Sequence, residues 1–323
     1  MTCLFAMMVT MVAADGFLLV ANKGDHTLGI VDPAAGQQVA VVAEGGVTGH
    51  EVTASPDGRT AFVPIYGNSG VGRPGTDGST MVAIDIQSRT VMGTLDFGHG
   101  VRPHCALFGP KNGLLYVSTE LDNSISIVDA KALKVIGSVP TGQPESHMFT
   151  ISSDGRRAYT ANVGPGTVSV LDLDARTVLK VIPISSNTQR IAISADDKWV
   201  FTADQTKPRV AVISTATNSV EHWVDLPSTG YGMAATPDGK WLVVALIEAK
   251  QVAVVDLQTL RVVKTVEVPA APQEVLVRPD GKIAYVSCDQ SRKVAAIRTS
   301  DWQVDTLIDA GKGADGLAWA SGR

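Results

Sequence analysis

Short apolar runs separated by turn residues recur along the whole chain. The runs are about four to seven residues long, rich in Val, Ile, Thr and Tyr, and bounded by Gly, Pro, Asn or Asp. Some, such as residues 242–246, are apolar throughout instead of alternating with polar residues, which indicates strands covered on both faces. The pattern therefore predicts an all-β chain of many short, buried strands.

Two markers repeat along the chain with a period of about 42 residues. The first is a turn of the Pro-Asp-Gly type, whose copies begin at Ser55, Gly109, Ser152, Ser194, Thr236 and Arg278. The second is an apolar pair followed usually by Asp, and it falls at Asp32, Asp85, Asp129, Asp172, Ser214, Asp256 and Arg298. Each unit between markers has room for four strands, and this period is typical of propeller blades. The sequence thus predicts a seven-bladed β-propeller with four antiparallel strands per blade.

The two ends of the chain are expected to share the seventh blade. Residues 17–21, 27–31 and 38–43 read as the three outer strands of a blade, and residues 315–320 supply the missing innermost strand. Pairing of the two ends closes the ring and leaves no exposed end blade. We expect one domain over residues 15–323.

The first residues form an apolar run, residues 4–14, that is too short to span a bilayer. It ends in Val12, Ala13 and Ala14, small residues of the kind that precede a signal-peptidase cut, although no Lys or Arg occurs before Lys23. We expect residues 1–14 to be the remnant of a signal peptide and the chain to work in a periplasm or outside the cell. The alternative is a buried strand.

Charge and motifs exclude several classes of partner and cofactor. Lys and Arg number 27 against 32 Asp and Glu, a net charge of −5, with no run of like charge. This argues against a nucleic-acid groove and against membrane insertion, and leaves a small-molecule ligand as the expected partner, with a protein partner possible. The chain has no GxxxxGK[ST] for a nucleotide, no GxSxG for a serine nucleophile, and no CxxCH for covalent haem.

Four tetrapeptides at the second strands carry a family resemblance. They read YVST, YTAN, FTAD and YVSC, and begin at Tyr116, Tyr159, Phe201 and Tyr285. They resemble the Tyr-Val-Thr-Asn motif of the YVTN propeller family, and the Pro-Asp-Gly turns match it too. The resemblance implies an exported seven-bladed propeller similar to YncE-like and surface-layer repeat proteins, and more distantly to cytochrome d1 and quinoprotein dehydrogenase propellers.

One position in each blade is expected to lie at the mouth of the central channel, five residues before each Pro-Asp-Gly-type turn. The positions are His50, His104, His147, Gln189, Tyr231, Gln273 and Asp315. Ring closure makes the three histidines and Asp315 one continuous arc. Three imidazoles and a carboxylate suit Zn, Cu, Mn or Fe, so we expect a divalent transition metal at His50, His104, His147 and Asp315.

Further candidates surround this arc. Glu51, Glu120 and Tyr231 are candidate catalytic groups, the two carboxylates as general bases. An insertion over residues 66–78, with five glycines, resembles a lid or binding loop beside His50 and offers Tyr66 and Arg73 to a ligand. The expected ligand contacts are Tyr66, Arg73, His99, Gln189, Arg190 and Gln273; Arg190 and Glu274 could instead form a charge pair.

Three functions remain open from the sequence. The first is a metal-dependent hydrolase or lyase acting on a small substrate. The second is a non-catalytic propeller that binds a ligand or a protein. The third is a redox accessory protein related to the d1-haem or quinoprotein propellers, in which a histidine at the channel mouth could ligate iron. Whether the chain is an enzyme stays undecided.

Overall fold

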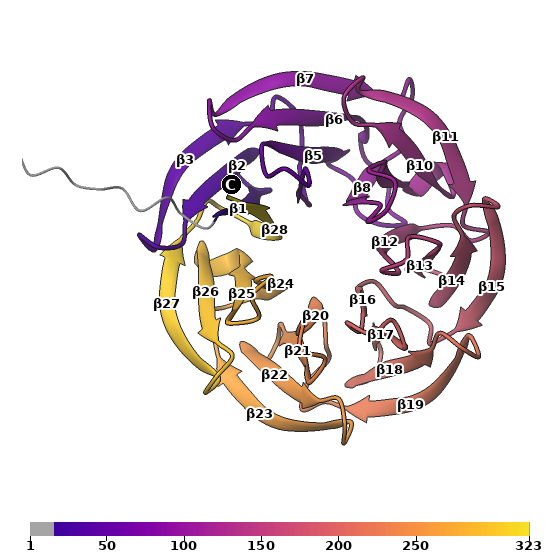
Figure 1. The fold of residues 1–323 in the computed structure, drawn as a ribbon, viewed down its shortest axis with the longest axis vertical. Coiled ribbons are helices and arrows are strands. Elements are labelled where there is room, and N and C mark those ends of the chain that lie inside the picture. The colour runs from indigo at the N-terminus through magenta and orange to yellow at the C-terminus, as the bar shows by residue number, and fades with distance from the viewer. Residues whose placement is uncertain (1–15, 323) are drawn as a thin grey trace, which may run out of the picture.

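A computed structural model describes residues 16–322 of the chain, and these form seven four-stranded antiparallel sheets arranged in a ring (Figure 1). The seven-bladed β-propeller expected from the repeats is confirmed. Blade 1 consists of β4 (Thr53–Ala54), β5 (Thr60–Gly67), β6 (Asp77–Asp85) and β7 (Thr90–Asp96). Blade 2 consists of β8 (Pro103–Phe108), β9 (Leu115–Thr119), β10 (Ser124–Asp129) and β11 (Lys134–Pro140). Blade 3 consists of β12 (Ser146–Ile151), β13 (Arg157–Asn162), β14 (Thr167–Asp172) and β15 (Thr177–Pro183).

The next three blades follow the same plan, with the first strand innermost. Blade 4 consists of β16 (Ile191–Ile193), β17 (Trp199–Asp204), β18 (Arg209–Ser214) and β19 (Ser219–Asp225). Blade 5 consists of β20 (Met233–Ala235), β21 (Trp241–Leu246), β22 (Gln251–Asp256) and β23 (Arg261–Glu267). Blade 6 consists of β24 (Pro272–Val277), β25 (Ile283–Cys288), β26 (Lys293–Arg298) and β27 (Gln303–Asp309). Two short 3-10 turns, η1 (Glu120–Asp122) and η2 (Asp289–Ser291), follow the second strands of blades 2 and 6.

The seventh blade joins the two ends of the chain. Its strands are β28 (Ala314–Ser321), β1 (Gly16–Asn22), β2 (Thr27–Asp32) and β3 (Gln37–Ala43), in that order outward. β28 pairs antiparallel with β1, from Gly16 opposite Ser321 to Asn22 opposite Ala314. The closure expected from the sequence is confirmed, while the expected signal-peptide remnant, residues 1–14, lies outside the described residues.

The repeated polar residues are turn formers. In the Pro-Asp-Gly turns, the Ser55 hydroxyl donates to Asp57 at 2.6 Å and also accepts from the N–H of Thr60 at 2.9 Å, and Gly58 adopts a left-handed φ of 69°. In the second marker, Asp32 accepts the N–H groups of the turn that follows it. Both markers therefore close hairpins, which explains why they recur once per blade.

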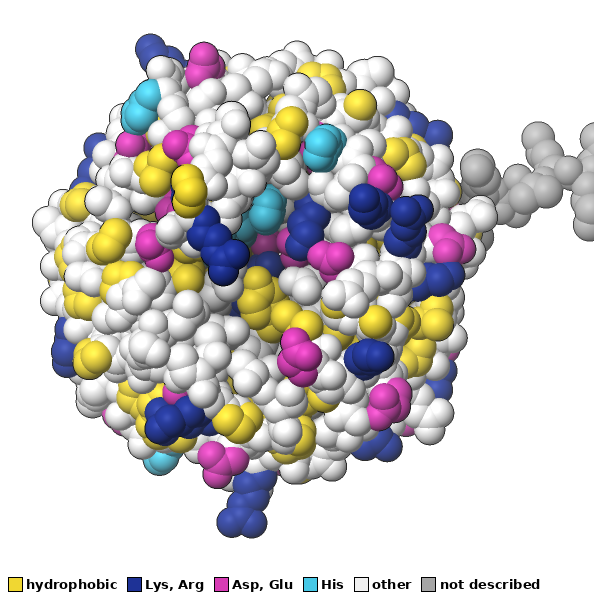
Figure 2. Space-filling model, turned by 180° about the vertical axis from the view of Figure 1, so that it is seen from behind, with side chains coloured by type: hydrophobic (Ala, Val, Ile, Leu, Met, Phe, Trp, Pro, Cys, Tyr) yellow, Lys and Arg dark blue, Asp and Glu magenta, His cyan; other side chains and the backbone are white. Residues whose placement is uncertain are grey.

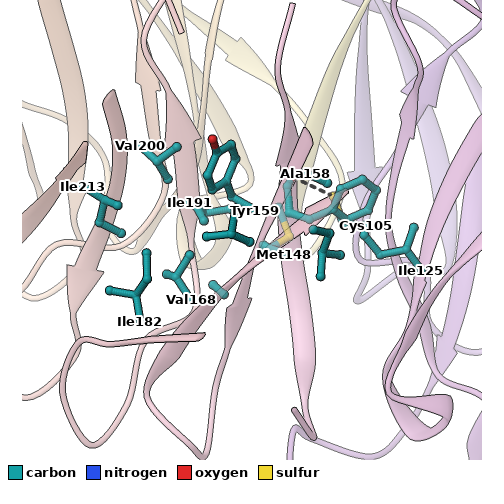
Figure 3. Packing of buried hydrophobic residues seen from close by; sticks show 14 of the residues in the cluster. Cys105, Ile125, Met148, Ala158, Tyr159, Val168, Ile182, Ile191, Val200 and Ile213 are labelled. Carbon is teal, nitrogen blue, oxygen red and sulfur yellow. Dashed lines mark hydrogen bonds between the residues drawn. The ribbon is translucent and has the colours of Figure 1, made fainter. Parts of the chain in front are cut away.

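The core lies between neighbouring blades. Figure 3 shows side chains of blades 2, 3 and 4 packed together, with Met148, Tyr159 and Ile191 in contact range between the sheets. The aromatic residues that open the tetrapeptides are buried, with 0–3% of Tyr116, Tyr159, Phe201 and Tyr285 exposed. Burial on both sheet faces accounts for the continuous apolar runs. Residues 16–322 contain no helix long and apolar enough to cross a membrane.

Candidate functional site

The innermost strands and the loops that precede them surround a central hollow. Figure 2 shows histidine, basic and acidic side chains gathered around this hollow on one face of the ring. Most of the residues counted as channel-mouth positions, together with neighbours such as Arg190, form two adjoining groups there. One group is built on histidines from blades 1 to 3, and the other on Arg190 from blade 4.

Three imidazoles from consecutive blades lie in contact. The ring centroids of His50 and His104 are 5.4 Å apart, and those of His104 and His147 are 3.6 Å apart with the ring planes tilted by 33°. Tyr66, at the end of β5, lies against all three rings at 5.0–5.9 Å. His104 and His147 are buried, with 1% and 3% of each residue exposed, whereas 25% of the His50 side chain is accessible. We call these three residues the histidine cluster.

Glu120 organises one side of the histidine cluster. Its Oε2 accepts from the Tyr66 hydroxyl at 2.8 Å and pairs with His147 Nδ1 at 3.1 Å, and its Oε1 accepts from Arg102 Nη1 at 3.4 Å. Burial works to raise the pKa of Glu120, but the hydrogen bonds from His147 and Tyr66 and the charge of Arg102 outweigh it and lower that pKa. Glu120 is therefore an ionised acceptor at neutral pH.

The anionic Glu120 fixes the tautomer of His147. Because Glu120 accepts, Nδ1 of His147 carries the proton, and Nε2 accepts from the Gln189 amide at 3.2 Å. Burial lowers the pKa of His147 in spite of the carboxylate, so the ring is neutral.

His104 differs from His147 because neither of its buried ring nitrogens has a hydrogen-bond partner among residues 16–322. Burial, together with the neighbouring imidazoles, holds its pKa well below the usual value. A buried, neutral imidazole with both nitrogens unpartnered is unusual, because buried polar atoms are almost always bonded.

Arg190 builds the second group by crossing the channel. Its Nη1 donates to Glu51 of blade 1 at 2.5 Å and to Glu274 of blade 6 at 2.6 Å, and its Nη2 donates to Asp315 of blade 7 at 3.2 Å. Its guanidinium carbon also lies 4.9 Å from the centre of the Tyr231 ring. One buried cation therefore ties blade 4 to the three blades across the ring; these four charged residues are the Arg190 cluster.

The carboxylates of the Arg190 cluster hold charge unequally. Burial raises the pKa of Glu51 to about 8 and that of Glu274 to about 7, against the opposing charge of Arg190. Burial also favours a higher pKa for Asp315, but Lys23, at 3.0 Å, and Arg190 lower it. Asp315 is therefore the group that stays ionised, and it lies 3.9 Å from His50 Nδ1, where the two groups meet.

The structure corrects the expected metal site. Across residues 16–322, no group of three or more His, Cys, Asp or Glu is placed to hold a metal ion. The rings of His104 and His147 lie against each other with their planes tilted by 33°, and Asp315 is engaged by Lys23 and Arg190. His50, His104, His147 and Asp315 are brought together as the blade count indicated, but as neighbours and not as one set of ligands.

The other candidates divide between the centre and the rim. Tyr66, Gln189 and Arg190 lie in the two groups, and Arg190 pairs with Glu274 as the sequence suggested it could. His99 lies outside them, with 63% of its side chain exposed, and pairs with Asp122 at 2.8 Å. The Arg73 side chain is exposed, and it is its carbonyl that is used, accepting from Arg102. The Gln273 carbonyl accepts the N–H of Gly232.

Sequence analysis missed Arg102 and Lys23. Arg102 lies two residues before His104, whereas Lys23 follows β1 and reaches Asp315 only because the two ends of the chain share a blade. Arg102 could have been predicted from the sequence, because it is a charged residue within two positions of the channel-mouth residue His104.

With this geometry in hand, comparison with known families is informative. The family model for the cytochrome D1 heme domain matches residues 110–319. The chain belongs to this family. The match includes His147, Gln189, Tyr231, Gln273 and Asp315 but leaves out His50 and His104. No curated protein sequence matches the chain.

Three solved structures share the fold of this cytochrome D1 heme domain family member. Hydrazine synthase of Kuenenia stuttgartiensis is 21% identical with a TM-score of 0.75, covering 93% of this chain and 99% of that one. A functionally unknown protein from Desulfotomaculum acetoxidans DSM 771 is 14% identical with a TM-score of 0.78, covering 95% and 100%. Dihydro-heme d1 dehydrogenase NirN, solved in complex with DHE, is 14% identical with a TM-score of 0.68, covering 97% and 77%.

The family match corrects the expected cofactor. The expectation was a Zn, Cu, Mn or Fe ion bound directly by side chains, with no covalent haem; it is wrong, because the family points to haem-related binding. A metal-binding hydrolase or lyase is not supported. The third function weighed from the sequence, a propeller related to the d1-haem domain, is supported instead, whereas the YVTN and YncE-like names are not confirmed.

Proposed function

We propose that the chain is a redox accessory propeller that binds a haem-type tetrapyrrole at the channel mouth, with His104 as the iron ligand. The observation that carries the proposal is the buried imidazole of His104, whose two nitrogens lack any partner within residues 16–322. Imidazole is a common protein ligand of haem iron. The donor chemistry of the site therefore fits a group of the kind that names the family.

The assignment to His104 rests on geometry, because His104 lies outside the matched residues. His147 is less suited, since Glu120 and Gln189 already engage both of its nitrogens. His50 is more exposed and lies beside Asp315. His104 alone of the three combines full burial with two free nitrogens.

The residues beside His104 are held in place by hydrogen bonds within the protein. Glu120 keeps the proton of His147 on Nδ1, and the Tyr66 hydroxyl donates to the same carboxylate. The rings of His50, Tyr66 and His147 surround His104, of which only 1% is exposed to water. When bound, an iron tetrapyrrole supplies one-electron redox chemistry.

A redox role needs an electron partner, so a protein or small-molecule donor or acceptor is part of the proposal. An exported location, in a periplasm or outside the cell, is also part of it, and is tested by fractionating cells that express the full chain.

The proposal is tested by titrating the purified chain, without a histidine tag, with haemin. We expect a shifted Soret band that saturates near one haemin per chain and is lost in His104→Ala. His222→Ala is the matched control, because His222 lies on the outer strand β19 and is exposed, and it should bind like the unchanged chain.

Iron-free protoporphyrin separates two kinds of binding. If His104 ligates iron, His104→Ala weakens haemin binding and leaves protoporphyrin binding, followed by fluorescence, nearly unchanged. Absence of haemin binding by the unchanged chain, or equal haemin binding by His104→Ala, would refute the proposal.

A further inference from the structure

We propose that residues 68–76 form a lid over the histidine cluster and that Arg102 is the positioning residue that latches it to Glu120. The lid serves the ligand site proposed above, but the contacts that hold it are made within the protein and involve no ligand.

The lid crosses the blades that carry the three histidines. It leaves β5 and returns to β6 of blade 1, and its neck is closed by the Asn68 side chain, which accepts the N–H of Thr76 at 2.6 Å. Its tip reaches the loop before β12 of blade 3, where a Cβ added to Gly72 would lie only 2.8 Å from Glu145 Oε1. A segment anchored in blade 1 that touches blade 3 passes blade 2 on the way. It therefore runs over the arc in which His50, His104 and His147 lie.

A single guanidinium holds this lid. Arg102 Nη1 donates to the carbonyl of Gly70 at 3.1 Å and Nη2 donates to that of Arg73 at 2.8 Å. Nε donates to Asp77 at 2.7 Å, at the start of β6 where the lid ends. Only 8% of the Arg102 side chain is exposed, so these bonds are shielded from water and stronger than surface ones.

The same guanidinium touches the histidine cluster. Nη1, which binds the lid at Gly70, also lies 3.4 Å from Glu120 Oε1, and Glu120 in turn orients His147 and Tyr66. Arg102 Nη1 thus couples the position of the lid to the orientation of His147, because it contacts both the lid and Glu120. A ligand that reaches His104 must displace the lid, and reclosure re-forms the contact that sets His147.

The test is residue-resolved labelling with diethyl pyrocarbonate at pH 7.5, read by mass spectrometry. The reagent modifies neutral imidazoles, and burial keeps the cluster neutral, so labelling rates there report access. His26 and His222 are exposed and serve as references within each sample. In the unchanged chain, His104 and His147 should label far more slowly than the references.

Arg102→Gln should raise the labelling rates of His104 and His147 by roughly tenfold or more, as expected when buried charge-assisted hydrogen bonds are lost, and leave His26 and His222 unchanged. Arg73→Ala is the matched control and should change nothing, because the lid uses the Arg73 carbonyl and its side chain is exposed. Asp77→Asn changes a more exposed partner of Arg102, so His104 and His147 should label at a rate between those of the unchanged chain and Arg102→Gln. This second variant tests the lid if Arg102→Gln does not fold.

Equal protection of His104 in the Arg102→Gln, Asp77→Asn and unchanged chains would overturn the lid, as would rapid labelling of His104 in the unchanged chain. The haemin titration has a separate outcome. Protection that depends on Arg102 without haemin binding would keep the lid and refute the proposed ligand, and haemin binding without such protection would do the reverse.

Discussion

Removal of the cation that crosses the channel should destabilise the whole ring. In Arg190→Met, the side chain keeps a similar length but loses the charge that faces Glu51, Glu274 and Asp315 at 2.5–3.2 Å. Removing one partner of a buried ion pair typically costs about 3–5 kcal/mol, because the remaining charge is left uncompensated. We expect a loss in this range at pH 8, where Glu51 and Glu274 must either ionise without a counter-charge or take up protons, while Asp315 keeps Lys23 at 3.0 Å.

The loss should depend on pH in a defined direction. The pKa values of Glu51 and Glu274 are already raised by burial, to about 8 and about 7, and without Arg190 they rise further. The folded variant then binds more protons than the unfolded chain, so its stability falls as pH rises. At pH 5 both glutamates are neutral in the folded state, and we expect the loss to shrink to about 1–2 kcal/mol.

Urea denaturation followed by the fluorescence of the five Trp residues measures both effects. Arg298→Met is the matched control. Arg298 also pairs with two carboxylates, Asp301 and Asp305, but on the surface, so its removal should cost less than about 1 kcal/mol at either pH. Adding Glu51→Gln to Arg190→Met should recover part of the loss at pH 8. A loss for Arg190→Met as small as that for Arg298→Met, or one equal at both pH values, would refute the argument.

Three further predictions concern other parts of the molecule. Burial raises the pKa of Glu44 to about 7, and only the hydrogen bond from the N–H of Gly49 opposes this. The free energy of unfolding should therefore fall as pH rises from about 4.5 to about 7, because Glu44 ionises less readily in the folded state than in the unfolded chain. Glu44→Gln should remove about 3 kcal/mol of this fall, measured by urea denaturation at several pH values in that range. Deletion of residues 314–323 removes β28 and leaves β1 unpaired on its inner side, so the truncated chain should lose its cooperative unfolding transition and show a larger hydrodynamic radius. Burial holds the pKa of His104 well below its usual value, so its imidazole stays unprotonated on acidification. Haemin affinity should therefore be the same at pH 7.5 and at pH 5.5. A solvent-exposed histidine ligand would instead bind haemin more weakly at pH 5.5, because it takes up a proton.

The fold was readable from the sequence because each blade repeats the same local chemistry. Ser55 and Asp57 close a hairpin by contacts that span only a few residues, and such contacts are encoded where they occur. The number of repeats then gives the number of blades, and the strands left over at the two ends of the chain must form the remaining blade. The count of five residues back from each turn also placed His50, His104 and His147 correctly beside one another.

The chemistry of the site was not readable in the same way. Equivalent backbone positions bring side chains close, but rotamers decide whether ring nitrogens converge on one point. The rings of His104 and His147 instead lie against each other, with centroids 3.6 Å apart and planes tilted by 33°. The position of Arg102 also carries no repeat signal, since its bonds go to carbonyls of an insertion that occurs in one blade only. The mistaken metal site followed from treating nearness of ligand types as coordination.

The contacts of Arg190 depend on the closed ring and not on the repeat. Along the chain its partners Glu51, Glu274 and Asp315 are 139, 84 and 125 residues away, yet all four lie on the inner wall of one narrow channel. The arginine side chain is long enough to cross that channel, so Arg190 finds its carboxylate partners on blades 1, 6 and 7 and not on the blades next to its own. The cation of the Arg190 cluster is thereby paired with carboxylates across the ring, and the neutral histidine cluster beside it is the part of the mouth that we propose as the ligand site.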